Sequence, residues 1–353
     1  MKTTFVSSAA VTSALRYSLL RQQSELAKAQ KEASSGFVAD TGLALGARTA
    51  QSVTLHRDLE RLGGIVDSNG LVSARLSATQ KALTQVGAAA QSFLSSLTSS
   101  ASGDAAYALT QKSGRATLDT LTSVLNTSLN GEYLFSGTNT DVKPINDFKP
   151  GSPTKVAFDA AFAGYFGFSQ NHADAQDITA ADMNNFMSTI VEPMFLGADW
   201  QTPPPAGSPW SNATNQGITS RITLNETTET SVSANNEGIR KIAMSAAIIS
   251  DLLDSNVGNA ARGALVTHAV SSIGEAISDI GQLEAQTGII EQRVKSATDR
   301  INVQVDLYER YILDTEGVDY YVASARVADL VSQIDRSYAL TARIQQLSLM
   351  KYL

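Results

Sequence analysis

Residues 266–312 read VTHAVSSIGEAISDIGQLEAQTGIIEQRVKSATDRINVQVDLYERYI. Apolar or small side chains recur there every three or four residues, with one polar member: Val266, Val270, Ile273, Ile277, Ile280, Leu283, Thr287, Ile290, Val294, Ala297, Ile301, Val305, Tyr308 and Ile312. This spacing is typical of one coiled-coil-like helix face. At about 1.5 Å per residue the helix would be about 70 Å long, whereas a compact protein of this length measures about 50 Å across. We therefore expect an elongated, rod-like molecule.

The distribution of prolines extends this expectation to both ends of the chain. All eight prolines lie between Pro144 and Pro209, and both tryptophans, Trp200 and Trp210, lie in the same window. Because proline disrupts helices, the proline-free flanks can form long ones. The periodicity predicts helices over about 11–34, 55–99, 105–129 and 236–254, a break at Thr315-Glu316-Gly317 and a last helix toward the C-terminus.

The middle of the chain has a different pattern. Seven of the eleven phenylalanines lie between residues 148 and 195, which predicts a small core not built from helices. GITSRITLNETTETSV (217–232) alternates β-formers with polar residues and predicts strands, and YLFSGT (133–138) predicts a strand entering a turn. The stretch from Trp200 to Trp210, with three consecutive prolines, predicts an extended loop.

The expected fold class is mainly α with a β-rich insertion. Both chain ends would form a long antiparallel helical rod, coiled-coil-like, that carries a small central β domain. The expected domains are a terminal coiled-coil layer (1–40 and 319–353), a helical rod domain (41–139 and 233–318) and a β-rich outward domain (140–232). We expect the β-rich domain to be removable without loss of the helices.

Composition excludes several classes of function. The net charge is −7 and the 27 Lys and Arg form no basic run, so no nucleic-acid partner is expected. The chain has no cysteine, which removes disulfides, thiolate metal sites and cysteine nucleophiles and suits an exported protein. No apolar stretch reaches the roughly 18 residues of a membrane span, and the N-terminus lacks the apolar core of a cleaved signal peptide. Export is expected to use another route.

No pattern of residues predicts catalysis. The three histidines, His56, His172 and His268, are far apart in sequence and lie in no metal-ligand spacing. NHADAQD (171–177) does not match a calcium-binding loop. No HExxH, P-loop or GxSxG string occurs. We expect no catalytic, cofactor-binding or metal site, and a protein that is not an enzyme.

The apolar stripes near both ends are the candidate functional residues. The expected assembly interface comprises Leu15, Leu19, Leu26, Leu330, Ile334, Leu340, Ile344, Leu347 and Leu349. The two ends could pack on one another within one chain, or become fully ordered only in a polymer. Two short helices bury little apolar area against an ordering cost of about 1–2 kcal/mol per residue. The polymer is therefore favoured, with both ends disordered in the free monomer.

Three strings point to a family: the N-terminal helix leading into Ser34-Ser35-Gly36, NGEYLFSGTNTD at 130–141 and LSLMKYL at 347–353. Together they resemble the flagellin superfamily and, within it, the hook-associated protein 3 family, which forms the hook–filament junction. The resemblance covers about 140 residues at each end. Filament flagellins carry Ile-Asn-Thr-Asn and Ala-Asp-Asp-Ala strings where this chain has TTFV (3–6) and VADTG (38–42). This departure and the Met350-Lys351-Tyr352-Leu353 ending favour the junction family.

The resemblance implies a structural role outside the cell. The terminal helices would pair as an inner coiled-coil layer, the next helices would form a rod, and the middle would face outward. The implied partners are hook-associated protein 1, flagellin, other copies of this chain in a ring, and the flagellar export chaperone and export apparatus. The implied location is the hook–filament junction of the bacterial flagellum. A divergent filament flagellin and a secreted coiled-coil adhesin are the alternatives.

Overall fold

The computed structural model describes residues 8–99, 104–201, 210–253 and 255–349. These residues form two compact units, each considered by itself below. Unit 1 comprises the described residues within Met1–Gly64 and Arg300–Leu353, and unit 2 comprises those within Ile65–Asp299. The long helices α3 (Thr49–Ser99) and α9 (Asn259–Glu316) contribute to both units. The expected fold class, mainly α with a small β insertion, is confirmed.

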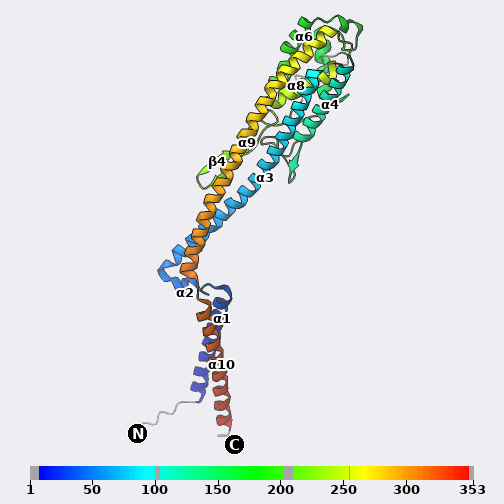
Figure 1. The fold of residues 1–353 in the computed structure, drawn as a ribbon. Helices are drawn as coiled ribbons and strands as arrows, with labels where there is room; N and C mark the ends of the chain where they lie inside the picture. Colours follow the sequence, from blue (N-terminus) through cyan, green and yellow to red (C-terminus); the bar gives the residue numbers. More distant parts are fainter. Residues whose placement is uncertain (1–7, 100–103, 202–209, 254, 350–353) are drawn as a thin grey trace, which may run out of the picture. The chain divides into compact units, whose positions relative to one another are not determined.

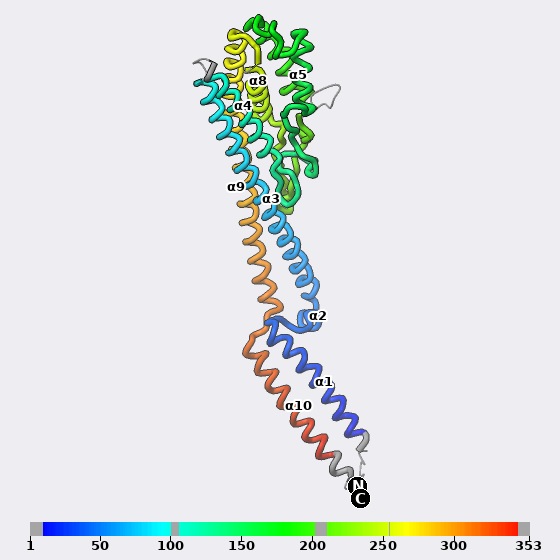
Figure 2. Tube along the Cα trace, turned by 90° about the vertical axis from the view of Figure 1, so that its right-hand side faces the viewer, coloured from blue at the N-terminus to red at the C-terminus, as the bar shows by residue number. Residues whose placement is uncertain are grey.

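Unit 1 is built around a pair of helices from opposite ends of the chain. Its elements are α1 (Ser8–Ser35), α2 (Thr41–Leu45), the short 3-10 helix Gly46–Arg48, the first part of α3, the last part of α9, and α10 (Tyr320–Leu349). Helices α1 and α10 lie side by side in both views (Figures 1 and 2). The expected end of the first helix near Gly36 is confirmed, because Gly36 takes a φ of 74° directly after α1.

Unit 2 holds most of the hydrophobic core. Its remaining elements are α4 (Asp104–Leu125), β1 (Ser128–Leu129), β2 (Glu132–Tyr133), α5 (Pro153–Phe166), the 3-10 helix Ala173–Asp177, α6 (Ala180–Phe186), the π-helix Met187–Val191, α7 (Glu192–Leu196), the 3-10 helix Ala198–Trp200, β3 (Thr219–Thr223), β4 (Glu226–Glu229) and α8 (Glu237–Leu252). Helix α8 packs against α4 and is buried along most of its length. Each strand pair is an antiparallel two-stranded sheet.

The periodic stretch of α9 forms one continuous helix, as its spacing predicts. None of its fourteen seam positions is exposed, and Ile273, Ile280 and Val294 are at most 1% exposed. The helix ends at Glu316, as predicted, because Gly317 follows. A Cβ at Gly317 would lie 2.2 Å from the carbonyl oxygen of Leu313, so only glycine fits this helix end.

The third predicted helix is shorter than its periodicity indicates. Helix α4 ends at Leu125, and β1 and β2 follow as a hairpin. The turn residues Asn130 and Gly131 have φ values of 54° and 87°, the left-handed conformation that a two-residue hairpin turn requires. The turn signal at 130–131 therefore closes a hairpin and does not end the helix.

The predicted strands at 217–232 form the β3–β4 hairpin, which packs against α3 and α9 within unit 2. Ile222 of β3 is fully buried against Leu76 of α3 and against Val294 and Ala297 of α9. The side-chain amide of Asn69 donates hydrogen bonds to the Ile222 carbonyl (2.9 Å) and to the Thr298 hydroxyl (3.0 Å). The hairpin thus connects the two long helices.

The expectation of a non-helical phenylalanine core is wrong. Phe158 and Phe162 lie on α5, and Phe186 on α6. Helix α5 forms because the Ser152 side chain caps its N-terminus and Pro153 occupies the first turn, where proline is tolerated. Thr179 caps α6 in the same way, accepting a hydrogen bond from the Asp182 amide.

This core is also continuous with the helices of unit 2. The fully buried phenylalanines of the middle segment belong to one hydrophobic cluster with residues of α3, α4, α8 and α9. Trp200 and Trp210 belong to it, stacked with ring centroids 5.7 Å apart. The segment 140–232 therefore shares the core of unit 2, which argues against its removal as an independent unit. Most of the expected loop between the tryptophans lies outside the described residues, and the expected domain boundaries stay a prediction.

Candidate assembly surface

The α1–α10 pair carries the candidate functional residues. Small side chains bring the two helices together: Ala29 of α1 is fully buried and Ala323 of α10 is 2% exposed. Ile334, farther along α10, is 8% exposed. The pair therefore buries a narrow apolar seam, as expected when two helices pack without further layers.

Polar contacts fix the register of the pair. The Gln23 amide donates to the Tyr338 hydroxyl (2.9 Å), and the Ser337 hydroxyl donates to Oε1 of Gln22 (3.0 Å). Near the start of α10, the guanidinium of Arg326 lies 2.9 Å from a carboxylate oxygen of Glu25 on α1. These contacts join residues about 300 positions apart in the sequence, so the two chain ends pair within one molecule.

The predicted interface residues lie mostly on the inner side of this pair. Ile334 is buried, and five others are half-buried: Leu15, Leu19, Leu26, Leu330 and Ile344. Leu340 is 53% exposed. The side chains of Leu347 and Leu349 lie outside the described residues. The intramolecular alternative therefore accounts for the half-buried residues, and the assembly role of all nine stays a prediction.

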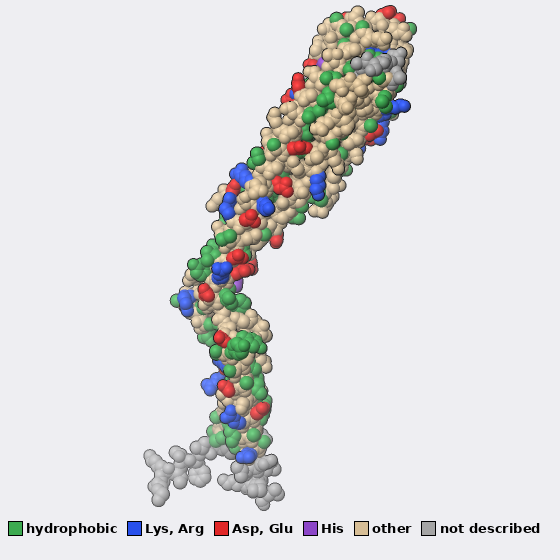
Figure 3. All heavy atoms as spheres, in the orientation of Figure 1, with side chains coloured by type: hydrophobic (Ala, Val, Ile, Leu, Met, Phe, Trp, Pro, Cys, Tyr) green, Lys and Arg blue, Asp and Glu red, His purple; other side chains and the backbone are tan. Residues whose placement is uncertain are grey.

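The structure also identifies outward-facing apolar residues that the sequence analysis missed. Together with Leu340, they form what we call the outer apolar surface: Tyr17 and Leu20 of α1, and Tyr320, Tyr321, Val322, Val331 and Tyr338 of α10. Their exposed fractions range from 41% for Val331 to 82% for Tyr321. Figure 3 shows hydrophobic side chains along the visible face of this helix pair.

Helical geometry places several of these residues in lines. Tyr320, Val331 and Tyr338 are 11 and 7 residues apart, close to whole numbers of turns, so they share one face of α10. Val322 and Leu340, 18 residues apart, lie on another face. The buried Ile334 lies between these two faces. Helix α10 thus presents exposed apolar residues on both sides of its seam with α1.

Such stripes are costly in water. Burying a leucine or valine side chain stabilises a protein by about 1.5–3 kcal/mol relative to leaving it exposed, and contiguous exposed apolar patches mark interaction sites. Helix α9 adds a further line in unit 1, with Val303, Leu307 and Tyr311 spaced by four residues and 69%, 47% and 51% exposed. Unit 1 therefore has apolar surface available for neighbouring molecules.

The histidines form local contacts with single carboxylates. Nε2 of His56 lies 3.0 Å from an oxygen of Glu316, and Nε2 of His268 lies 3.0 Å from an oxygen of Glu192. His172 caps the 3-10 helix that begins at Ala173. Among the described residues, no group of three or more His, Cys, Asp and Glu could hold a metal ion.

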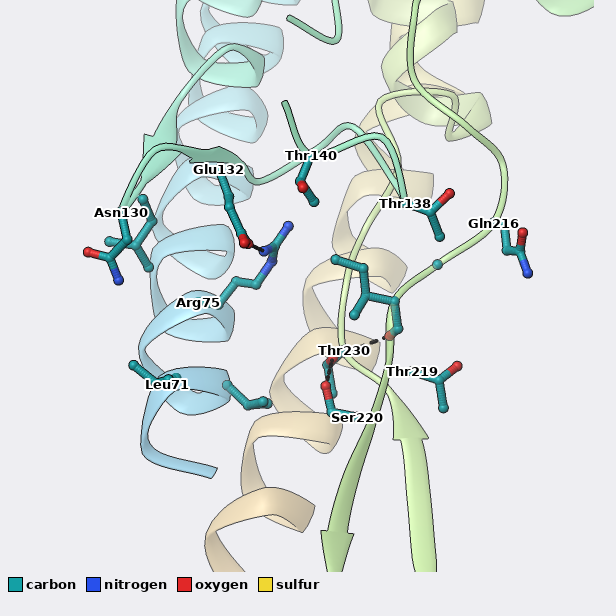
Figure 4. Close-up of a pocket in the computed structure, with 14 residues that line it drawn as sticks. Leu71, Arg75, Asn130, Glu132, Thr138, Thr140, Gln216, Thr219, Ser220 and Thr230 are labelled. Carbon is teal, nitrogen blue, oxygen red and sulfur yellow. Dashed lines mark hydrogen bonds and ion pairs between the residues drawn. The ribbon is translucent and has the colours of Figure 1, made fainter. Parts of the chain in front are cut away.

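Unit 2 contains a groove of about 810 Å³ that is open to solvent. It lies between α3, the β1–β2 hairpin and the residues leading into β3 (Figure 4). The Arg75 guanidinium in its wall lies 2.7 Å from a carboxylate oxygen of Glu132 and donates to the Tyr133 carbonyl. The other polar groups in the lining are mostly threonine, serine and amide side chains, which are weak acids and bases. The groove brings together no activated nucleophile.

Comparisons with known proteins bear on this surface. The bacterial flagellin N-terminal helical region matches residues 6–140, and the flagellin C-terminal helical region matches residues 270–353, together more than half of the chain. No curated protein matches the chain in sequence. One solved structure, described as a flagellar hook-associated protein from Vibrio parahaemolyticus, is similar with a TM-score of 0.52 and 11% identity, over 76% of this chain and 97% of that chain. At this identity the likeness shows a shared fold. None of the described helices is both long and apolar enough to cross a membrane.

Proposed function

Because the chain belongs to the flagellin superfamily of flagellar structural proteins, we propose that it forms the junction between hook-associated protein 1 and the flagellin filament. The observation that carries the proposal is the match of flagellin regions at both ends of a chain whose middle is small. The similar fold of a hook-associated protein supports the same reading. The LSLMKYL ending favours the junction over the filament.

The α1–α10 pair would be the part that inserts among neighbouring molecules. Its outer apolar surface would pack against other copies in a ring, against hook-associated protein 1 on one side and against flagellin on the other. A junction protein meets two unlike neighbours, so its two ring faces need not be complementary to each other. Poor self-polymerisation is the consequence. The chain would leave the cell through the flagellar export apparatus with an export chaperone.

The proposal is tested by adding the purified protein to isolated hooks. We expect it to bind hooks that carry hook-associated protein 1, to add a short layer, and then to permit growth of filaments from purified flagellin. A strain without it should assemble hooks and release unpolymerised flagellin into the medium. Growth of long filaments from seeds by this protein alone would replace the proposal with a divergent flagellin. Binding of the protein to host cells, without any binding to hooks, would favour an adhesin.

A matched pair of variants tests the role of the outer apolar surface. Leu340→Asp changes a side chain that is 53% exposed, so the free energy of unfolding of the monomer should change by no more than about 0.5 kcal/mol. Addition to hooks should fail, because the charge would be buried without a partner in the assembly. Ile334→Ala alters the buried seam and should instead loosen the helix pair itself. Normal hook binding by Leu340→Asp would exclude this face from the interface.

A further inference from the structure

Two short connectors meet within unit 1. One links α1 to α2 through residues 36–40, and the other links α9 to α10 through residues 317–319. They are joined by an isolated antiparallel bridge between Phe37 and Gly317. The amide of Val38 donates to the Glu316 carbonyl (2.8 Å), and the amide of Val318 donates to the Gly36 carbonyl (2.8 Å). The segment that follows α1 and the segment that precedes α10 are thus joined by two backbone hydrogen bonds.

The side chain of Glu316 extends this tie to a third helix. Glu316 is the last residue of α9 and is only 3% exposed. Its carboxylate accepts a hydrogen bond from the Ser52 hydroxyl, and both of its oxygens lie near Nε2 of His56, at 3.0 and 3.2 Å. Ser52 and His56 are one turn apart on α3. One residue therefore offers its carbonyl to the first connector and its carboxylate to α3.

The buried carboxylate of Glu316 is stable in this position only while Ser52 and His56 remain in contact with it. A buried charged group is expensive unless hydrogen bonds replace the water that it has lost. If the contacts with Ser52 and His56 break, the carboxylate regains water only when the end of α9 moves away from α3. Because the Glu316 carbonyl and Gly317 belong to that end, this movement pulls on both bonds of the bridge.

We infer that Glu316 is the latch of a conformational joint. While its carboxylate is bound to α3, the two connectors are held together and α1 and α10 move as a pair. When the latch opens, the Val38 and Val318 hydrogen bonds open together, and the α1–α10 pair, still joined along its own seam, can change its position relative to the first part of α3. The joint is a property of the single chain and goes beyond the proposed junction role, so a failure of either leaves the other intact.

Amide hydrogen exchange on the full-length protein tests the latch. We expect Glu316→Ala to speed exchange at both Val38 and Val318 by about tenfold, which corresponds to a loss of about 1.4 kcal/mol of local stability. The amide of Ala297, in the middle of α9, should keep its rate. The control is Glu309→Ala, which removes an exposed acid from the same helix and should leave both connector amides unchanged.

Two milder variants keep the test valid if Glu316→Ala does not fold. Glu316→Gln retains an oxygen that can accept from Ser52, and Ser52→Ala removes one donor only. Each should speed exchange at Val38 and Val318 together, by less than Glu316→Ala does. The inference is overturned if the variants leave both amides protected, or if one amide exchanges faster while the other does not change.

Discussion

The side-chain amide of Asn69 donates a 2.9 Å hydrogen bond to the carbonyl of Ile222, although 153 residues separate the two in sequence. Asn69 lies on α3 and is 1% exposed, and Ile222 is fully buried in the β3–β4 hairpin. This hydrogen bond fixes the position of the hairpin along α3. Because Ile222 also contacts α9, the hairpin sets the register of the two long helices within unit 2.

The first prediction is that Ile222→Ala destabilises unit 2. The loss of a fully buried isoleucine side chain should lower the free energy of unfolding by about 2–5 kcal/mol. Urea unfolding followed by circular dichroism measures this value. Thr227→Ala, at an exposed position of β4, is the control and should change it by no more than about 0.5 kcal/mol. Equal effects of the two substitutions would mean that the buried Ile222 side chain contributes no more to stability than an exposed residue of the hairpin.

A second prediction concerns the core shared by the middle segment and the helices. Phe162→Ala should lower the free energy of unfolding by about 3–5 kcal/mol. Both tryptophans are buried in the same core, so tryptophan fluorescence and the helical signal of unit 2 should be lost at the same urea concentration. Val156→Ala, 55% exposed on the same helix, is the control. A middle segment that unfolds separately, with the helices intact, would restore the idea of an independent domain.

The third prediction is a dependence of stability on pH. Burial raises the pKa of Asp251, although Lys155 lies 2.8 Å away and opposes the shift, and the nearby Asp159 adds to it. A raised pKa means that the folded state holds this proton more tightly than the unfolded state does. The stability contributed by protonation is therefore present below the ordinary value of 3.8 and is lost as the pH rises through the folded-state pKa.

Asp251→Asn removes this titration and tests the prediction. Relative to the parent protein, the variant should gain stability as the pH is raised from about 3 to about 7, since the parent alone then loses its protonation advantage. Urea midpoints at several pH values across this range provide the measurement. Asp174→Asn, at a site that is 66% exposed, should run parallel to the parent. The assignment to Asp251 is wrong if both variants follow the parent at every pH.

The fourth prediction is that the chain ends are the parts of the free monomer most sensitive to proteases. The α1–α10 seam is narrow, and much apolar surface of the pair is uncovered. Limited proteolysis should remove roughly the first 35 and last 35 residues before it cuts unit 2. Incorporation into a flagellum should protect both ends. First cleavage within α5 or α8, with the ends intact, would contradict this order.

Much of the helical architecture could be predicted from the sequence, because its signals are local. The seam of α9 follows from spacing alone, and Gly36 and Gly317 mark helix ends through the backbone conformation or close approach that glycine permits. The β3–β4 hairpin follows from alternation and composition. Each of these features depends on residues close together in the chain, which is where sequence patterns are informative.

Periodicity does not predict the helices of the phenylalanine core, although the sequence carries signals for them. Pro153 lies in the first turn of α5, where the missing amide hydrogen costs nothing, so a proline at this position is compatible with a helix. Phe158 and Phe162 are also one turn apart. A high local frequency of proline therefore says less than the position of each proline relative to a capping residue such as Ser152.

The outer apolar surface could not be separated from the seam by periodicity. Leu330 and Tyr338 lie on the same helix and both are apolar, and only the rotation of α10 against α1 decides which one faces inward. That rotation depends on contacts such as Gln23 with Tyr338, across nearly the whole chain. Sequence spacing identifies the helix face but not the neighbour that covers it.

The same pairing has a consequence during translation. Gln23 and Tyr338 are 315 residues apart, so α1 leaves the ribosome long before its partner helix exists. At synthesis rates of about 5–20 residues per second, this delay is roughly 15 to 60 seconds. Throughout that interval the apolar face of the nascent α1 lacks α10. Protection of this face before α10 exists would require a factor that binds the nascent chain.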